Sequence, residues 1–137
     1  MDDQTLVFRA LQARMYAYAP YSHWTVGAAL LTAKGEVYTG CNIENAAFTP
    51  TNCAERTAFF KAISEGKRDF SAIAIVGGTE GEEPDAPCAP CGICRQVMAE
   101  FCGPQFRIIL GTKDGVAEVH TLAELFPCSF GPGNLQG

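Results

Sequence analysis

Two runs of the sequence, Cys53-Ala54-Glu55-Arg56 and Pro90-Cys91-Gly92-Ile93-Cys94, together supply three thiols and one carboxylate. Apolar residues recur at helical spacing after each run, so each is predicted to begin a helix. Three cysteines can occupy three corners of a tetrahedral zinc site and leave the fourth corner for water, which distinguishes a catalytic site from a closed structural one. The two runs therefore predict two helix N-termini that meet around one zinc ion, with Cys53, Cys91 and Cys94 as ligands.

Glu55 and Arg56 follow the first predicted ligand directly. Glu55 is not needed as a ligand, and a carboxylate beside zinc-bound water can take up its proton and deliver it to a substrate. Alternatively, Glu55 only complements the helix dipole. Three thiolates leave the zinc site with a net charge of about −1, which Arg56 or Arg95 could offset by hydrogen bonds to sulfur, unless both are solvated surface residues. The spacing favours Glu55 as the catalytic acid and base, and Arg56 over Arg95.

Cys88 allows a different metal site. The chain has seven cysteines, an odd number, and in a cytosolic protein this favours metal or thiol chemistry over disulfides. Cys88-x-x-Cys91-x-x-Cys94 also resembles the start of an iron–sulfur run, or Cys88 could close the zinc site as a fourth thiolate. The further cysteine and proline of the bacterial ferredoxin pattern are missing after Cys94. We therefore favour Cys88 as a bystander.

Length and charge narrow the possible partners. The 137 residues, 47% of them hydrophobic, are enough for one core, so we expect a single domain over residues 1–137. The net charge is −5 without any run of Lys and Arg, which disfavours nucleic acid as a partner. No apolar stretch approaches the roughly 20 residues of a membrane span, and the start Met1-Asp2-Asp3 lacks the basic flank of a signal peptide. These features predict a cytoplasmic protein that does not bind membranes.

Helical and strand patterns alternate along the chain. Val7, Leu11, Met15 and Tyr18 predict a first helix that stops at Ala19-Pro20. Later helices are expected to begin near residues 53, 91 and 121, the last with a capping box Thr121-Leu122-Ala123-Glu124. Strands are predicted at 25–33, 36–41, 71–77, 106–110 and 116–120, and the tail 129–137 as irregular. About five strands and four helices in this order indicate a layered α/β domain.

The chain also resembles a known family. The resemblance rests on the two zinc runs and on two further segments, Tyr21-Ser22-His23-Trp24-Thr25-Val26-Gly27-Ala28-Ala29-Leu30 and Gly40-Cys41-Asn42-Ile43-Glu44-Asn45-Ala46-Ala47-Phe48. With these segments the chain resembles the small homotetrameric cytidine deaminases over nearly its whole length. The resemblance implies a three-layer α/β/α fold with a mixed sheet and one zinc ion per subunit. The Asp114-Gly115 turn agrees with the antiparallel last strand that this family has. In polynucleotide deaminases, the corresponding last two strands run parallel.

The resemblance assigns roles to further residues. Asn42 and Glu44 would bind the ribose hydroxyls, Trp24 would pack near the base, and the backbone of Ala54 would hydrogen-bond the base. The alternative for Asn42 and Glu44 is polar loop residues with local backbone bonds. Phe130 resembles the tail aromatic that closes a neighbouring subunit's site, and alternatively anchors its own tail.

The implied activity is hydrolytic deamination of cytidine and 2′-deoxycytidine to uridine and 2′-deoxyuridine with release of ammonia, in pyrimidine salvage. Glu44 would repel a phosphate group, so free nucleosides are expected as substrates. The family usually has Phe where this chain has Trp24, and often Tyr where it has Phe48, which leaves a different nucleoside or analogue open. A non-catalytic, zinc-stabilised binding module with Cys88 as fourth ligand is a third interpretation, against which Asn42, Glu44 and Glu55 argue.

Overall fold

A computed structural model describes residues 1–136 and contains a mixed five-stranded sheet. The spatial order is β2-β1-β3-β4-β5. Strands β3 and β4 are parallel, while β1 pairs antiparallel with both β2 and β3, and β5 pairs antiparallel with β4. The strands are β1 Trp24–Thr32, β2 Val37–Cys41, β3 Phe70–Thr79, β4 Arg107–Thr112 and β5 Gly115–Thr121. The mixed sheet and the antiparallel last strand confirm the predicted topology.

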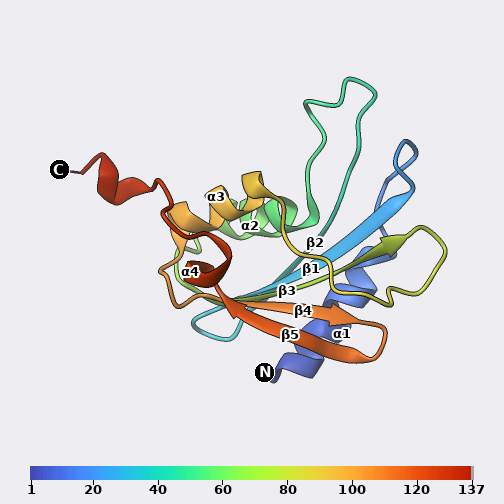
Figure 1. Cartoon of the computed structure of the whole chain (residues 1–137), viewed down its shortest axis with the longest axis horizontal. Helices are drawn as coiled ribbons and strands as arrows, with labels where there is room; N and C mark the ends of the chain where they lie inside the picture. The colour runs from blue at the N-terminus through green and yellow to red at the C-terminus, as the bar shows by residue number, and fades with distance from the viewer. Residues whose placement is uncertain (137) are drawn as a thin grey trace.

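Helices cover both faces of this sheet (Figure 1). One face carries α1, and the other carries α2, α3 and the short α4. The helices are α1 Asp3–Arg14, α2 Ala54–Ser64, α3 Gly92–Phe101 and α4 Leu122–Leu125. The expected three-layer α/β/α architecture is therefore confirmed.

Each face of the sheet has its own apolar core. The core under α1 is small, because its sheet side is made largely of alanine and valine. The core under α2 and α3 is larger and contains the aromatic residues. Its buried members include Leu30, Phe59, Ile73, Ile75, Met98, Phe106 and Ile108. Strands β1, β3 and β4 are buried on both faces, which explains their nearly continuous apolar sequences.

Two glycines allow the helices to approach the sheet closely. A Cβ atom at Gly27 would lie 2.0 Å from the carbonyl oxygen of Ala10 in α1. A Cβ atom at Gly40 would lie 2.5 Å from the carbonyl oxygen of Ala54 and 2.6 Å from the backbone nitrogen of Ala58 in α2. Any larger residue at Gly40 would push the first turn of α2, and with it the Cys53 run, away from the sheet.

Helix α1 is shorter than the periodicity predicts. It ends at Arg14, and both Met15 and Tyr18 are exposed, so the predicted continuation to Tyr18 is wrong. Arg14 is buried and donates from Nε to the Thr25 carbonyl oxygen at 3.0 Å. The backbone nitrogen of Tyr18 donates to the Asn42 carbonyl oxygen at 2.9 Å in an isolated β-bridge region. Hydrogen bonds to residues distant in sequence therefore end the helix at Arg14, although the local apolar pattern favours a longer one.

Most other boundaries lie within two residues of the prediction. The capping box at Thr121 and Glu124 is confirmed, because each residue's side chain bonds the other's backbone nitrogen. Gly66 adopts a φ of 90° just after the end of α2, as expected of a helix stop. The predicted irregular tail contains one short 3-10 helix, Pro132–Asn134, and its last residue, Gly137, lies outside the described residues.

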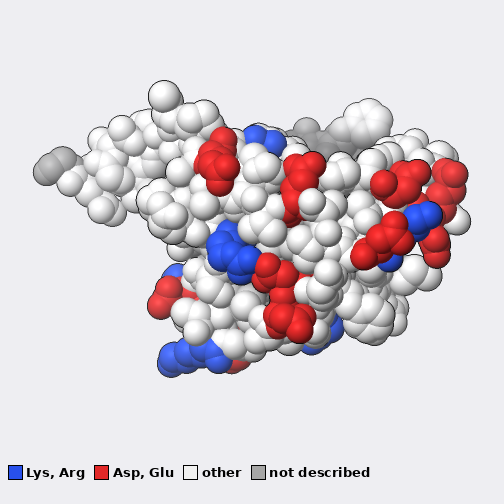
Figure 2. Space-filling view, turned by 60° about the horizontal axis from the view of Figure 1, so that its bottom comes forward, with Lys and Arg blue, Asp and Glu red and all other residues white. Residues whose placement is uncertain are grey.

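Charged side chains are mixed over the face seen in Figure 2, where basic groups are interspersed with acidic ones. No continuous basic surface is visible on that face. Among residues 1–136, none of the helices combines the length and the apolar character that crossing a membrane requires.

Candidate active site

The three predicted ligands come together. Cys53 is the N-cap residue of α2, Cys91 is the N-cap residue of α3, and Cys94 lies in the first turn of α3. Their Sγ atoms all lie within 4.8 Å of one another, and those of Cys53 and Cys91 are 3.7 Å apart. Zinc–sulfur bonds of about 2.3 Å in a tetrahedron place two sulfur atoms about 3.8 Å apart. The thiol cluster therefore fits a zinc ion.

The two helix N-termini explain why these thiols suit a metal. Neither Cys53 nor Cys91 uses its side chain to cap its own helix, so both sulfur atoms remain available to a ligand. The unpaired backbone N–H groups of a first helical turn create a positive potential that favours thiolates over thiols. The fold thus brings three thiol groups from the first turns of two helices to one point.

Arg56 contacts this cluster directly. Its Nη2 atom donates to the sulfur of Cys53 at 3.2 Å. Burial alone would lower the pKa of Arg56, but hydrogen bonds to the sulfurs of Cys53 and Cys94 outweigh burial and raise that pKa. The hydrogen bond from Cys94 lowers the pKa of Cys53 to about 5 against the effect of burial, and Arg56 adds to the lowering. The same shared hydrogen bond raises the pKa of Cys94. The two thiols thus share one hydrogen bond beside the Arg56 guanidinium.

Glu55 is buried beside the thiols, with only 4% of its surface exposed. Burial raises the pKa of Glu55 to about 7, and the negative charge of Cys53 adds to this increase. The Cys94 thiol and the backbone N–H of Glu55 itself act in the opposite direction as hydrogen-bond donors. A carboxyl group with a pKa near neutrality can both accept and donate a proton at physiological pH. This environment is unlike that of a solvated helix-capping Glu.

Cys88 and Arg95 lie outside the metal cluster. In the described part of the chain, the group of possible metal ligands contains three cysteines and does not include Cys88. Arg95 donates from Nε to the Pro90 carbonyl oxygen at 2.8 Å and from Nη1 to the Leu125 carbonyl oxygen. Arg95 therefore stabilises the loop that precedes Cys91, whereas Arg56 is the arginine that donates to the Cys53 sulfur.

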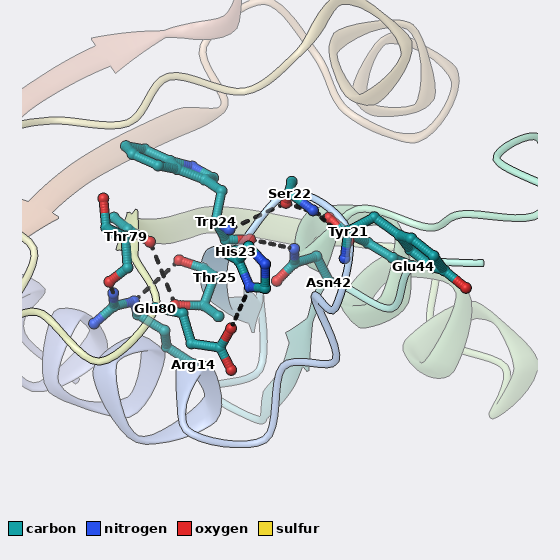
Figure 3. A network of polar contacts seen from close by, with 11 residues as sticks. Arg14, Tyr21, Ser22, His23, Trp24, Thr25, Asn42, Glu44, Thr79 and Glu80 are labelled. Carbon is teal, nitrogen blue, oxygen red and sulfur yellow. Dashed lines mark hydrogen bonds and ion pairs between the residues drawn. The ribbon is translucent and has the colours of Figure 1, made fainter. Parts of the chain in front are cut away.

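Asn42 and Trp24 meet at the start of β1 (Figure 3). Asn42 is buried and bridges two backbone groups of this strand. Its Nδ2 atom donates to the Trp24 carbonyl oxygen and its Oδ1 atom accepts from the Val26 nitrogen, both at 2.8 Å. A second Nδ2 proton and a second Oδ1 lone pair remain for another partner. Asn42 thus bonds backbone groups, as the alternative interpretation expected, but these groups belong to a distant strand and not to its own loop.

Glu44 holds the segment that precedes Trp24 (Figure 3). Its Oε1 atom accepts from the backbone nitrogens of Tyr21 at 3.0 Å and Ser22 at 3.1 Å, and its Oε2 atom accepts from the Ser22 hydroxyl. The Ser22 Oγ atom also accepts from the Trp24 nitrogen at 3.0 Å. The Ser22 hydroxyl lowers the pKa of Glu44, as do these backbone donors. This role of Ser22 was not predicted, and its only local signal is the offset of two residues before Trp24.

The remaining predicted residues differ in position. Ala54 is fully buried at the first position of α2, where its backbone N–H belongs to the unpaired first turn. Phe130 lies in the tail beyond α4, and its carbonyl oxygen accepts from Gln96 of α3 at 2.8 Å. Its side chain is exposed, as is that of Phe48 in the loop between β2 and α2. Both segments project from the body of the domain (Figure 1).

Three thiols and a buried carboxylate at two helix N-termini define a zinc hydrolase site on an α/β/α scaffold. A family profile described as "Cytidine and deoxycytidylate deaminase zinc-binding region" matches residues 1–110. The cytidine deaminase of Sporosarcina psychrophila is 50% identical over 135 residues, which are 98% of this chain and 96% of that protein. The cytidine deaminase of Halalkalibacterium halodurans is 52% identical over 130 residues, 95% of either chain.

A solved structure agrees with these relatives. The crystal structure of cytidine deaminase from Burkholderia pseudomallei superposes with a TM-score of 0.85 at 46% identity, covering 95% of this chain and all of that one. The chain therefore belongs to the cytidine deaminase family and has that family's zinc-binding region.

Proposed function

We propose that this protein hydrolyses the exocyclic amino group of cytidine and 2′-deoxycytidine, forming uridine or 2′-deoxyuridine and ammonia. The observation that carries the proposal is the position of Glu55, buried beside three thiols that fit one zinc ion. A structural zinc site gives no reason to bury a carboxyl group at this position, because burial without a partner charge is costly. The identity of 50% to a cytidine deaminase over nearly the whole chain supports the same substrate.

Glu55 moves the protons in the proposed reaction. When bound, zinc supplies a Lewis acid that makes a coordinated water easier to deprotonate. Glu55 accepts the proton that the attacking water loses as its oxygen adds to C4 of the base. It passes this proton to N3 and then moves the remaining proton of the added hydroxyl to the amino group. The C4–N bond breaks, ammonia leaves, and the oxygen stays on C4 as the carbonyl of the uracil ring. The pKa of about 7 suits a group that must alternate between the two forms.

Arg56 and the helix N-termini adjust the charge of the centre. Three thiolates around Zn2+ give a net charge of about −1, which opposes the loss of a proton from water. The bond from Arg56 to the Cys53 sulfur, at 3.2 Å, draws electron density from that ligand. Arg56 therefore acts through the ligand and does not touch the substrate.

The substrate would lie between the Cys53 run and the start of β1. Trp24 offers an aromatic surface for the base, and the backbone N–H of Ala54 offers a hydrogen-bond donor. The free capacity of Asn42 and Glu44 would bind the ribose hydroxyls. A carboxylate at this place repels phosphate, and the net charge of −5 gives no general attraction for polynucleotides. Free nucleosides are therefore the proposed substrates.

We also propose that the protein is a homotetramer whose subunits complete one another's sites. Phe48 is 71% exposed and Phe130 is 56% exposed, and both lie on segments that project from the domain (Figure 1). Large exposed aromatic side chains on projecting segments are common at subunit contacts. In this arrangement Phe130 would close the site of a neighbouring subunit. A cytoplasmic role in pyrimidine salvage would suit a protein with free cysteines at all seven positions.

The direct test is uridine formation from cytidine by the purified protein, with and without a zinc chelator. We expect turnover that the chelator removes and added zinc restores. Adenosine and guanosine serve as controls for other aminated bases. A folded, zinc-loaded protein that converts none of these nucleosides would contradict the proposal and favour a binding module.

A further inference from the structure

Cys88 lies on the sheet next to the metal centre without belonging to it. A Cβ atom at Gly77 would lie 2.7 Å from the Cys88 sulfur and 3.2 Å from Cγ2 of Val26. Gly77 on β3 pairs with Val26 on β1, so the sulfur lies over the sheet beside Val26. The thiol can occupy this place because Gly77 has no side chain. Cys88 therefore has a defined position, although the loop that carries it is irregular.

Trp24 precedes Val26 by two residues in β1, so the two side chains lie on the same face of the sheet. Side chains two residues apart in a strand share a face, so the indole projects to the side on which Val26 packs against the core under α2 and α3. The indole N–H of Trp24 is thereby placed on the side where the Cys88 sulfur lies over Gly77, and as a donor it acts to lower the pKa of that thiol. Burial raises the pKa of the Cys88 thiol despite this donor, and the charges of Glu55 and Cys53 add to the increase. The thiol is thus close to both the indole and the catalytic centre.

The backbone of Trp24 is fixed, but its ring needs a separate support. The Trp24 carbonyl oxygen accepts from Asn42, and its nitrogen donates to Ser22 (Figure 3). The side chain is 45% exposed, so its two side-chain torsions are not determined by core packing. A hydrogen bond from the indole N–H to the Cys88 sulfur would select one ring orientation and reduce the entropy lost when a base stacks on it.

We propose that Cys88 is a positioning residue whose thiol, seated over Gly77, accepts the indole N–H of Trp24 and holds the ring as a wall for the nucleobase. The role of the wall rests on the function proposed above, whereas the contact itself does not. Cys88 acts on substrate affinity through Trp24 and makes no contact with zinc. This assigns a function to Cys88, one of the four cysteines that the metal site leaves unused.

The contact can be measured without any substrate, because Trp24 is the only tryptophan. A thiol in contact with an indole quenches its fluorescence, and neither a hydroxyl nor a methyl group does so efficiently. We expect brighter emission from Cys88→Val and Cys88→Ser than from the wild type. Cys102→Ala, which alters another half-buried cysteine, should leave the emission unchanged. All four proteins should emit equally when unfolded in denaturant.

The positioning role predicts a separation of kinetic parameters. Cys88→Val removes the acceptor, so KM for cytidine should rise about 3- to 10-fold while kcat changes less than about twofold. Cys88→Ser keeps an acceptor, so its KM should stay within about twofold of the wild type. Zinc content should equal that of the wild type in both variants.

Four results would overturn all or part of the inference. Unchanged emission in both Cys88 variants would show that the indole does not touch the thiol, whatever the activity. Brighter emission with an unchanged KM in Cys88→Val would show a contact without a positioning role. Loss of zinc from Cys88→Val would assign Cys88 to the metal instead. A wild-type protein inactive on cytidine would contradict the proposed function, and with it the wall, while leaving the fluorescence test of the contact intact.

Discussion

The Nη2 atom of Arg56 donates to the sulfur of Cys53 at 3.2 Å, so the proposed zinc ligand and the charge proposed to offset it lie one turn apart on the same helix. This spacing follows from the geometry of α2, because residues three apart share a helix face. The positive charge therefore reaches the thiolate without a partner from another element. A contact of this kind should affect the reactivity of the metal centre more than its assembly.

Arg56→Ala should reduce kcat about 10- to 100-fold while zinc remains bound, because the charge on the ligands is no longer offset. Arg56→Gln, which can keep a neutral donor near the sulfur, should lose less activity. Steady-state kinetics and elemental analysis of the same samples provide the measurement. Wild-type kinetics in Arg56→Ala would remove this role. Arg95→Ala is the matched control, because the Arg95 side chain donates to the carbonyl oxygens of Pro90 and Leu125 and not to a sulfur. Losing these bonds should lower thermal stability.

Glu55→Gln should reduce kcat about 100- to 10,000-fold, because the amide cannot transfer protons. The amide has nearly the same volume as the carboxyl group, and it avoids the cost of burying a charge, so the melting temperature should not fall. Zinc content should stay at one ion per chain. Glu100→Gln, an exposed carboxylate on α3, should behave as the wild type. Near-normal turnover by Glu55→Gln would refute the proposed proton transfer.

Cys91→Ser should lose zinc and activity together, because two thiolates remain where three are needed. The loss of metal should also lower the melting temperature, since binding free energy contributes to folding. Cys128→Ser, which changes an exposed cysteine, should keep its zinc. Elemental analysis and thermal unfolding with and without chelator would measure both effects. Full zinc occupancy in Cys91→Ser would show that the metal has other ligands.

Glu44→Gln should raise KM for cytidine with little change in kcat, because the ribose contact is made equally in the ground state and the transition state. Its carboxylate also holds the nitrogens of Tyr21 and Ser22, so Glu44→Ala should affect KM more strongly than Glu44→Gln. Michaelis–Menten kinetics with cytidine and with a ribose-phosphorylated cytidine would measure this. If Glu44 repels phosphate, the wild type should discriminate against the nucleotide more strongly than Glu44→Gln. Equal discrimination would contradict that role.

Subunit sharing predicts that two inactive variants restore one another. Phe130→Ala would leave each neighbouring site open, and Glu55→Gln would stop proton transfer in each subunit's own site. Mixed tetramers of the two variants would contain some sites with an intact Glu55 and a neighbour's intact Phe130. We expect activity to recover after co-refolding or co-expression, and sedimentation to give a tetramer. A fully active monomer, or mixtures no more active than their parents, would exclude shared sites.

Much of the fold could be predicted from local pattern. The apolar runs of β1, β3 and β4 are typical of buried strands, and the Asp114-Gly115 turn, with its φ of 108° at the glycine, correctly indicated an antiparallel last pair. The capping box at Thr121 marked the start of α4. These features depend on residues adjacent in the chain. The end of α1 was predicted incorrectly, because Arg14 is held by strands β1 and β3.

The sequence by itself determined the chemistry of the site: three thiols, a carboxylate and an arginine at fixed offsets, since the spacing within each run places the side chains on one helix turn. The tertiary structure showed that the three predicted ligands meet without Cys88, which the sequence had left open as a fourth ligand; Cys53 and Cys91 begin different helices, and Gly40 sets how closely α2 approaches the sheet. It also placed Cys88 over Gly77 and engaged Glu44 with the Tyr21–Ser22 segment. Such contacts join residues far apart in the chain, and local propensity carries no information about them.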